Sequence, residues 1–294
     1  MAGLVPAMKE AGVVAQTEDQ RMTAWPQSLA LVGAGKMGGA MLKGWIAGGL
    51  APASVTLIDP SPSPEMIDFA AAQGVAVNPP ADRRIAPEVL VLAIKPQMLE
   101  AAAPGVADLA GAQTLVLSIV AGKTIANLEA RLPRARAFVR AMPNTPAAVG
   151  RGVTGAAAGA AVTARQRELT QTLLSAVGQF AWLPDEGSID AVTALSGSGP
   201  AYVFALAEAL AEAGAALGLP PEIAMRFARA TVEGAGELMF REQETPAARL
   251  RENVTSPGGT TAAALAVLQA PDGLAALMRR AVAAAHRRAG ELAG

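Results

Sequence analysis

The chain has 294 residues, of which 52% are hydrophobic and 17% charged, and its net charge is −1. This composition is typical of a globular protein with one large or two modest domains. The near-neutral charge and 3% aromatic content argue against a nucleic-acid partner. With no cysteine and a single histidine, His286, the chain lacks the residues of a thiolate or multi-histidine metal site, so no metal is expected.

Residues 1–27 carry several charges and no continuous apolar segment, so they are predicted to form a loose N-terminal extension rather than a signal peptide. The longest apolar run, residues 201–219, is interrupted by Glu208 and Glu212. This pattern does not favour a membrane span, and we expect a cytoplasmic protein without a membrane partner.

Short apolar runs alternate with helical patterns between residues 28 and 184. The runs at 89–94 and 114–120 are almost continuously apolar, which is typical of strands covered on both faces. The resulting βαβαβ order predicts a doubly wound parallel sheet, a Rossmann-like α/β domain over 28–184. Strands are predicted at 28–32, 55–58, 89–94, 114–120, 135–142 and 152–158, and helices at 37–46, 64–73, 125–131 and 164–177.

The remaining residues, 185–294, are predicted to form an all-α domain. Several of its helices are rich in Ala, Gly and Leu on nearly every face, and short helices of this kind cannot bury those faces alone. Burial between subunits would cover them, so we expect an obligate oligomer. The helices are predicted at 200–217, 221–240, 246–252, 260–269 and 271–293.

A glycine-rich turn with the pattern G-x-G-x-x-G follows the first strand and opens a helix. Gly33 permits the tight turn, Gly35 lets the backbone approach a pyrophosphate, and Gly38 allows the helix to pack on the strand. This context predicts dinucleotide binding. The candidate cofactor-binding residues of the turn are Gly33, Ala34, Gly35, Lys36, Met37 and Gly38.

Further cofactor contacts are predicted where later strands end, because open α/β sheets bind ligands at the carboxyl ends of their strands. Asp59 lies where an acid usually holds the ribose diol of NAD, whereas Ser61 offers a hydroxyl for the 2′-phosphate of NADP. These two residues leave the choice of cofactor open. The crests of two further strands add Ala93, Ile94, Lys95, Pro96, Ala121 and Gly122.

Residues 253–261, NVTSPGGTT, place four hydroxyls, two glycines and a proline directly before a helix. Free N–H groups at a helix start bind anions, and the absence of Lys or Arg favours a small carboxylate over a polyphosphate. The same residues would also serve as a plain helix cap, so the motif alone leaves both interpretations open. A second polar glycine motif, TALSGSGPAY at 193–202, also interrupts the helical half.

Together with GAGKMG, AIKPQ and AMPNTP (141–146), these two motifs closely resemble the pyrroline-5-carboxylate reductase family over residues 28–290. The resemblance implies reduction of 1-pyrroline-5-carboxylate to L-proline, the last step of proline biosynthesis. It implies NADPH as the cofactor, with NADH open because Asp59 departs from the more neutral residues often found there. It also implies that the all-α half is a dimerisation domain and that the homodimers assemble into a decamer.

Carried onto this chain, the resemblance implies a cofactor contact at Asn253 and substrate contacts at Glu186, Ser256, Gly258, Gly259, Thr260 and Thr261. Our hypothesis is that Thr193 hydrogen-bonds the imine nitrogen as the catalytic hydroxyl. A β-hydroxyacid dehydrogenase-like enzyme is disfavoured because 201–219 lacks a catalytic lysine. A non-catalytic NADP-binding regulator is the second alternative, although both substrate motifs are intact.

Overall fold

The computed structural model describes residues 25–80 and 86–293, so most of the predicted extension 1–27 lies outside the described residues. One sheet has the strand order β3-β2-β1-β4-β5-β6-β7-β8. Strand order reverses on either side of β1, which is the topology of a doubly wound nucleotide-binding sheet. The strands are β1 (Leu29–Val32), β2 (Val55–Ile58), β3 (Ala76–Val77), β4 (Val89–Leu92), β5 (Leu115–Ser118), β6 (Ala137–Met142), β7 (Gly152–Ala158) and β8 (Gly178–Trp182).

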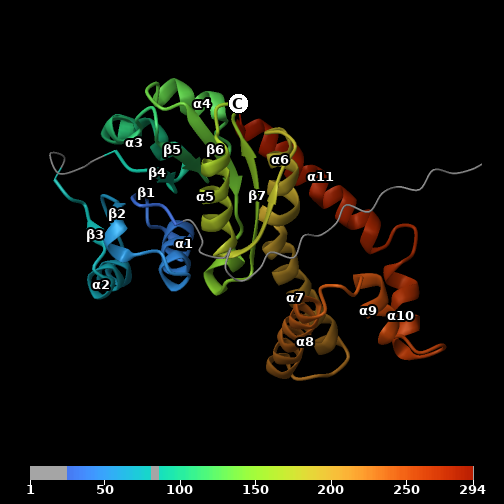
Figure 1. Cartoon of the computed structure of the whole chain (residues 1–294). Coiled ribbons are helices and arrows are strands. Elements are labelled where there is room, and N and C mark those ends of the chain that lie inside the picture. The colour runs from blue at the N-terminus through green and yellow to red at the C-terminus, as the bar shows by residue number, and fades with distance from the viewer. Residues whose placement is uncertain (1–24, 81–85, 294) are drawn as a thin grey trace, which may run out of the picture.

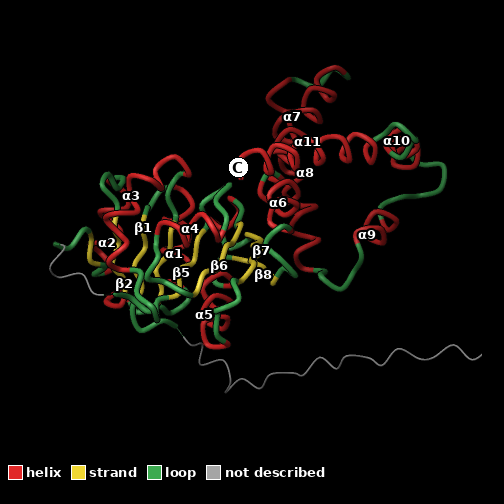
Figure 2. Tube along the Cα trace, turned by 90° about the horizontal axis from the view of Figure 1, so that it is seen from above, coloured by secondary structure: helices red, strands yellow, loops and turns green. Residues whose placement is uncertain are grey.

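Helices cover both faces of this sheet, and Figures 1 and 2 show them around it. Alternate residues of β1 belong to two separate hydrophobic clusters, one on each face. The predicted burial of the apolar strands is therefore confirmed. Helices α1 (Lys36–Ala47), α2 (Pro64–Gln73) and α5 (Ala164–Ser175) pack on one face, and α3 (Leu99–Val106) and α4 (Ile125–Arg131) on the other.

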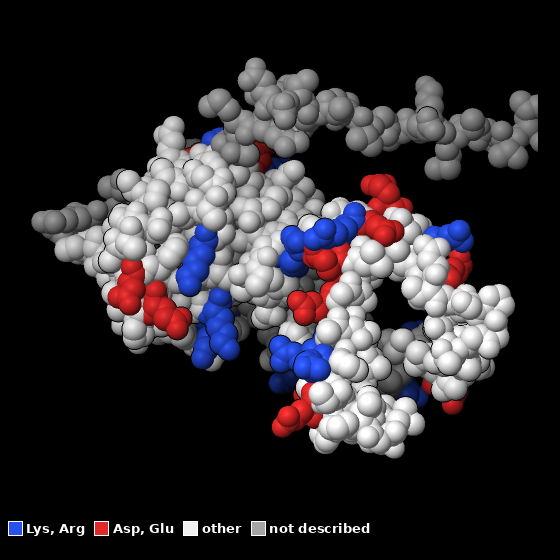
Figure 3. Space-filling model, turned by 90° about the horizontal axis from the view of Figure 1, so that it is seen from below, with Lys and Arg blue, Asp and Glu red and all other residues white. Residues whose placement is uncertain are grey.

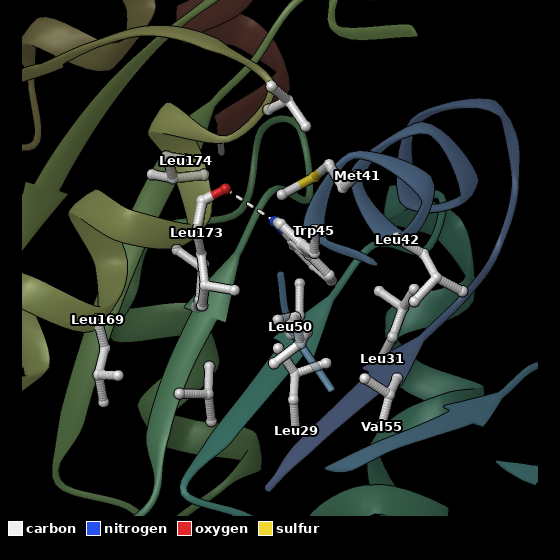
Figure 4. Packing of buried hydrophobic residues seen from close by; sticks show 14 of the residues in the cluster. Leu29, Leu31, Met41, Leu42, Trp45, Leu50, Val55, Leu169, Leu173 and Leu174 are labelled. Atoms are coloured by element: carbon white, nitrogen blue, oxygen red, sulfur yellow. Dashed lines mark hydrogen bonds between the residues drawn. The ribbon is translucent and has the colours of Figure 1, made fainter. Parts of the chain in front are cut away.

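The larger cluster centres on Trp45 of α1, which is fully buried between the sheet and α5. Its indole N–H donates a hydrogen bond of 2.7 Å to the carbonyl of Leu173 in α5, and Figure 4 shows this bond among the packed leucines. Because an indole N–H left unpaired in a core is unfavourable, this bond fixes how α1 sits against α5. The glycine turn that begins α1 is thereby anchored.

The prediction of a doubly wound parallel sheet is wrong for one strand pair, since β6 and β7 are antiparallel. They are joined by a short 3-10 segment, Thr145–Val149, whereas a parallel return needs a crossover of about a dozen residues or more. The chain then crosses over through α5, and β8 pairs parallel to β7.

Some short elements were not predicted. β3 has only two residues, and α3 contains Pro104, which disrupts a helical pattern. β8 is an edge strand whose residues alternate between exposed and half-buried, so it lacks the continuous apolar run of the central strands. The fourth unpredicted element is α6 (Ser188–Val192).

The helical half extends away from the sheet (Figure 1). Helix α7 packs along α8, and α11 returns to α6. In this single chain many apolar side chains of these helices are exposed, for example Phe204 at 64% and Val267 at 72%, and Figure 3 shows broad uncharged areas over this half. The helices are α7 (Gly199–Ala216), α8 (Pro221–Arg241), α9 (Ala247–Asn253), α10 (Thr260–Leu268) and α11 (Leu274–Ala293).

Candidate active site

The glycine turn has the geometry of a dinucleotide-binding loop. Gly33 has φ +90°, and a Cβ there would lie 2.8 Å from the carbonyl oxygen of Ala93. A Cβ at Gly38 would collide with the carbonyl of Gly33, so only glycine allows α1 to start this close to β1. Gly35, by contrast, has no neighbouring atom within 4 Å of its Cβ position and therefore leaves the loop open to a ligand.

The start of α1 also offers unfilled backbone donors. Its N-cap is Gly35, which provides no side-chain cap, and no acidic residue lies in the first turn. Such a helix start favours a pyrophosphate through its free N–H groups and the helix dipole. These residues fit a dinucleotide cofactor.

Asp59 is directed toward the glycine loop. One carboxylate oxygen accepts from the Ala34 N–H at 2.7 Å and the other from the Ser61 N–H at 2.9 Å. The side chain of Asn78 holds the Asp59 backbone, since its amide accepts from the Asp59 N–H at 2.9 Å and donates to the Asp59 carbonyl at 2.6 Å. Asp59 therefore braces the loop in addition to its predicted role beside the ribose.

The predicted cofactor residues on adjacent strand ends lie along one edge of the sheet. β2, β1, β4 and β5 are neighbours, so the segments that follow them meet at this edge. Gly122 there has φ +66°, and a Cβ would lie 2.7 Å from the carbonyl oxygen of Leu292. The end of α11 thus packs on the loop after β5. This contact explains why residue 122 is glycine, and the sequence alone does not reveal it.

Thr193 begins a π-helical segment, η7 (Thr193–Gly197), between α6 and α7. The motif at 193–202 interrupts the regular α-helix, as expected, through this π-helical turn and a bend at Ser198. The Thr193 hydroxyl donates to the Ile189 carbonyl at 2.8 Å, and Tyr202 donates to the Ala194 carbonyl at 2.9 Å. Single π turns of this kind are frequent at functional sites.

Glu186 lies in an ion-pair cluster. Its Oε1 accepts from the Ile125 N–H at 2.7 Å and lies 3.3 Å from the buried guanidinium of Arg140, which also contacts Asp190 at 3.4 Å. The substrate contact predicted for Glu186 stays a prediction, but in this structure the carboxylate already has protein partners.

The turn before α10 has the backbone of an anion site. Gly258 has φ +71°, the Gly259 N–H donates to the Ser256 carbonyl at 3.0 Å, and Gly259 caps α10 without a side-chain hydrogen bond. Thr260 and Thr261 open the helix, and no acidic residue lies in its first turn. In both Figures 1 and 2, however, α9 and α10 lie apart from the sheet.

Within one chain, then, the glycine loop meets the strand crests, but the turn at 256–261 and Asn253 remain distant from them. Arg140 and Asn78 support the site but were not among the residues predicted from the motifs. Arg140 had a detectable signal, because a charge within the apolar strand AFVRAM needs a buried partner. Asn78 had none, since its two hydrogen bonds join it to the backbone of Asp59, 19 residues earlier in the chain.

Two family models match the chain. Residues 28–122 match the model described as NADP oxidoreductase coenzyme F420-dependent, and residues 186–292 match pyrroline-5-carboxylate reductase dimerisation. The pyrroline-5-carboxylate reductase of Pseudomonas aeruginosa is 42% identical over 266 residues, covering 90% of this chain and 96% of that protein. That of Mycobacterium tuberculosis is 38% identical over 289 residues, with the same coverage of each chain.

The chain belongs to the pyrroline-5-carboxylate reductase family. The resemblance stated from the motifs, the oxidoreductase class and the fold of a Rossmann-like domain followed by a helical dimerisation domain are thereby confirmed. The dimerisation model also supports homo-oligomerisation of this reductase family member.

Solved structures agree with this assignment. A pyrroline-5-carboxylate reductase from Coxiella burnetii superimposes with a TM-score of 0.83 at 36% identity, covering 91% of this chain and 99% of the other. The Plasmodium falciparum pyrroline carboxylate reductase with NADP bound has a TM-score of 0.73 at 25% identity, covering 91% and 98%. In the part of the reductase that the structure describes, no helix is long and apolar enough to cross a membrane.

Proposed function

We propose that the chain reduces 1-pyrroline-5-carboxylate to L-proline with hydride from a nicotinamide cofactor, the last step of proline biosynthesis. The observation that carries this proposal is the similarity to pyrroline-5-carboxylate reductases over 90% of the chain. The two matched regions, 28–122 and 186–292, include both the glycine loop and the turn at 256–261.

The chemistry requires little beyond positioning. When bound, a reduced nicotinamide supplies a hydride to the imine carbon, while the imine nitrogen carries a proton and becomes the amine of proline. Holding donor and acceptor in near-attack geometry supplies much of the acceleration in such a reaction. No strong protein acid is needed, because a protonated imine is already a good hydride acceptor.

The residues divide this task between three places. The start of α1 holds the pyrophosphate, and the turn at 256–261 with the start of α10 binds the substrate carboxylate through backbone N–H groups and hydroxyls. Thr193 hydrogen-bonds the imine nitrogen. Because its hydroxyl proton is donated to the Ile189 carbonyl, its oxygen lone pairs accept the N–H of the protonated imine.

NADPH is the proposed donor, with NADH as a second one. Both carboxylate oxygens of Asp59 already accept backbone N–H groups, and Ser61 is exposed beside them, as a 2′-phosphate site requires. The NADP bound to the Plasmodium falciparum relative supports the same choice. Each Asp59 oxygen retains a free lone pair for a ribose hydroxyl, which is why NADH is kept as a second donor.

The complete site is proposed to form between two chains. In this chain α9 and α10 stand apart from the sheet, and Val267 and Leu268 of α10 are exposed. A partner subunit is therefore needed to bring the substrate turn of one chain to the nicotinamide edge of another. We propose a homodimer, assembled further into a decamer, and light scattering of the purified chain measures its mass. We also propose that the dinucleotide-binding domain ends at residue 184 and the helical domain begins at residue 185. The protein is proposed to be cytoplasmic.

The deciding experiment follows absorbance at 340 nm with 1-pyrroline-5-carboxylate and each reduced cofactor in turn, and detects L-proline as product. We expect oxidation of both cofactors, with a higher kcat/KM for NADPH. If neither cofactor is oxidised while both bind, the non-catalytic regulator is the better description. A β-hydroxyacid dehydrogenase activity is disfavoured because α7 carries no lysine.

A further inference from the structure

A buried ion cluster joins the sheet to the helical half. At its centre is Arg140 of β6, whose side chain is 4% exposed and lies between the carboxylates of Glu186 and Asp190 at 3.3 and 3.4 Å. Its Nε is buried and has no hydrogen-bond partner. A buried guanidinium needs such pairing, so its position depends on these two carboxylates.

The two carboxylates connect Arg140 to the segment that follows β5 and to the helix that precedes Thr193. Oε1 of Glu186 also accepts the N–H of Ile125, the first residue of α4, which directly follows the crest after β5. Asp190 lies in α6, one helical turn before Thr193. The cluster therefore links the predicted nicotinamide edge to the π-helical segment that carries Thr193.

Asn144 provides a second link from the same strand. It follows β6, is 8% exposed, and donates from its amide to the Ser196 carbonyl in η7 at 3.1 Å. Its Oδ1 accepts from the Val153 N–H at 2.9 Å, which fixes the amide against β7. The π-helical segment is thus held to the sheet on two sides, by Arg140 through α6 and by Asn144 directly.

We propose that Arg140 is a positioning residue for hydride transfer. Through Glu186 and Asp190 it fixes the position of η7, and therefore of Thr193, relative to the loop that follows β5. The role of Glu186 is then to connect α4 to Arg140 rather than to bind substrate. The expected effect on kcat rests on the proposed function. The connection that Arg140 makes between β6, α4 and α6 can be measured without turnover.

The test compares Arg140→Met and Arg140→Lys with the unaltered chain. A lysine restores the charge but not the planar fork that reaches two carboxylates, so it should recover only part of the loss. For Arg140→Met we expect kcat to fall on the order of 10²-fold, because small misplacements of reacting groups have effects of this size. The Kd for NADPH should stay within about twofold, since Arg140 does not contact the glycine loop.

Two further readouts separate positioning from simple stability. The kinetic isotope effect with NADPH deuterated at C4 should rise as hydride transfer becomes rate-limiting. Arg134→Met is the matched control, because Arg134 also pairs with a carboxylate but is 58% exposed, and its partners, Asp108 and the Ala107 carbonyl, do not belong to this cluster. If Arg140→Met does not fold, Asp190→Asn, which removes one ionic contact alone, gives the same isotope comparison.

Hydrogen exchange of peptides covering 125–131 and 186–198 completes the test in the absence of substrate. Faster exchange in Arg140→Lys together with reduced kcat supports the proposal. Reduced thermal stability with unchanged kcat overturns it, as does a Kd for NADPH that rises as much as kcat falls. If the unaltered chain does not reduce the imine, the proposed function fails, while the exchange data still decide whether Arg140 links the two halves.

Discussion

Replacing Gly35 with alanine should weaken cofactor binding without loss of stability. Its backbone angles, φ −64° and ψ −167°, suit any L-residue, and no atom lies within 4 Å of the added methyl. The free energy of unfolding should change by no more than about 0.5 kcal/mol. The methyl would occupy the surface where a pyrophosphate approaches the loop, and a 10–100-fold rise in Kd corresponds to about 1.4–2.8 kcal/mol.

Gly33→Ala is the matched comparison. Here φ is +90° and the methyl would lie 2.8 Å from the Ala93 carbonyl oxygen, so the fold itself should lose about 1–3 kcal/mol from backbone strain alone. Fluorescence titration with NADPH and thermal unfolding measure both quantities for each variant. Wild-type affinity in Gly35→Ala, or a loss of stability equal to that of Gly33→Ala, would refute the assignment of Gly35 to the cofactor surface.

Four other variants have expected outcomes. Trp45→Phe should lower the free energy of unfolding by about 1–3 kcal/mol, because it leaves a buried carbonyl unpaired, and calorimetry tests this. Thr193→Val should lower kcat with unchanged cofactor affinity, whereas Thr261→Val should chiefly raise KM for the imine; the reverse pattern would exchange their roles. The Arg131 hydrogen bond holds the pKa of Glu100 below its usual value, so this pair favours the folded state above the ordinary carboxyl pKa and loses that effect as pH falls through the lowered pKa. Nuclear magnetic resonance titration of Arg131→Gln should show the Glu100 pKa returning upward.

Much of the fold could be predicted because its signals are local. The glycine turn, the apolar strands and the helix starts are each written in a few consecutive residues, and periodicity reports them directly. The family followed from motifs of the same kind, and its confirmation rests on similarity over most of the chain. The elements missed, such as β3 and α3, are those whose own pattern is short or contains proline.

The sequence by itself therefore determined the fold class, the family and the glycine loop, because these depend on neighbouring residues. Only the tertiary structure decided that β7 runs antiparallel to β6, that Asp59 braces the loop through Ala34, and that Arg140 joins β6 to α4 and α6. Each of these features depends on groups that are distant along the chain and come into contact only when the sheet forms. An arginine in an apolar strand predicts that a buried polar partner exists. Only the folded structure shows which residue that partner is.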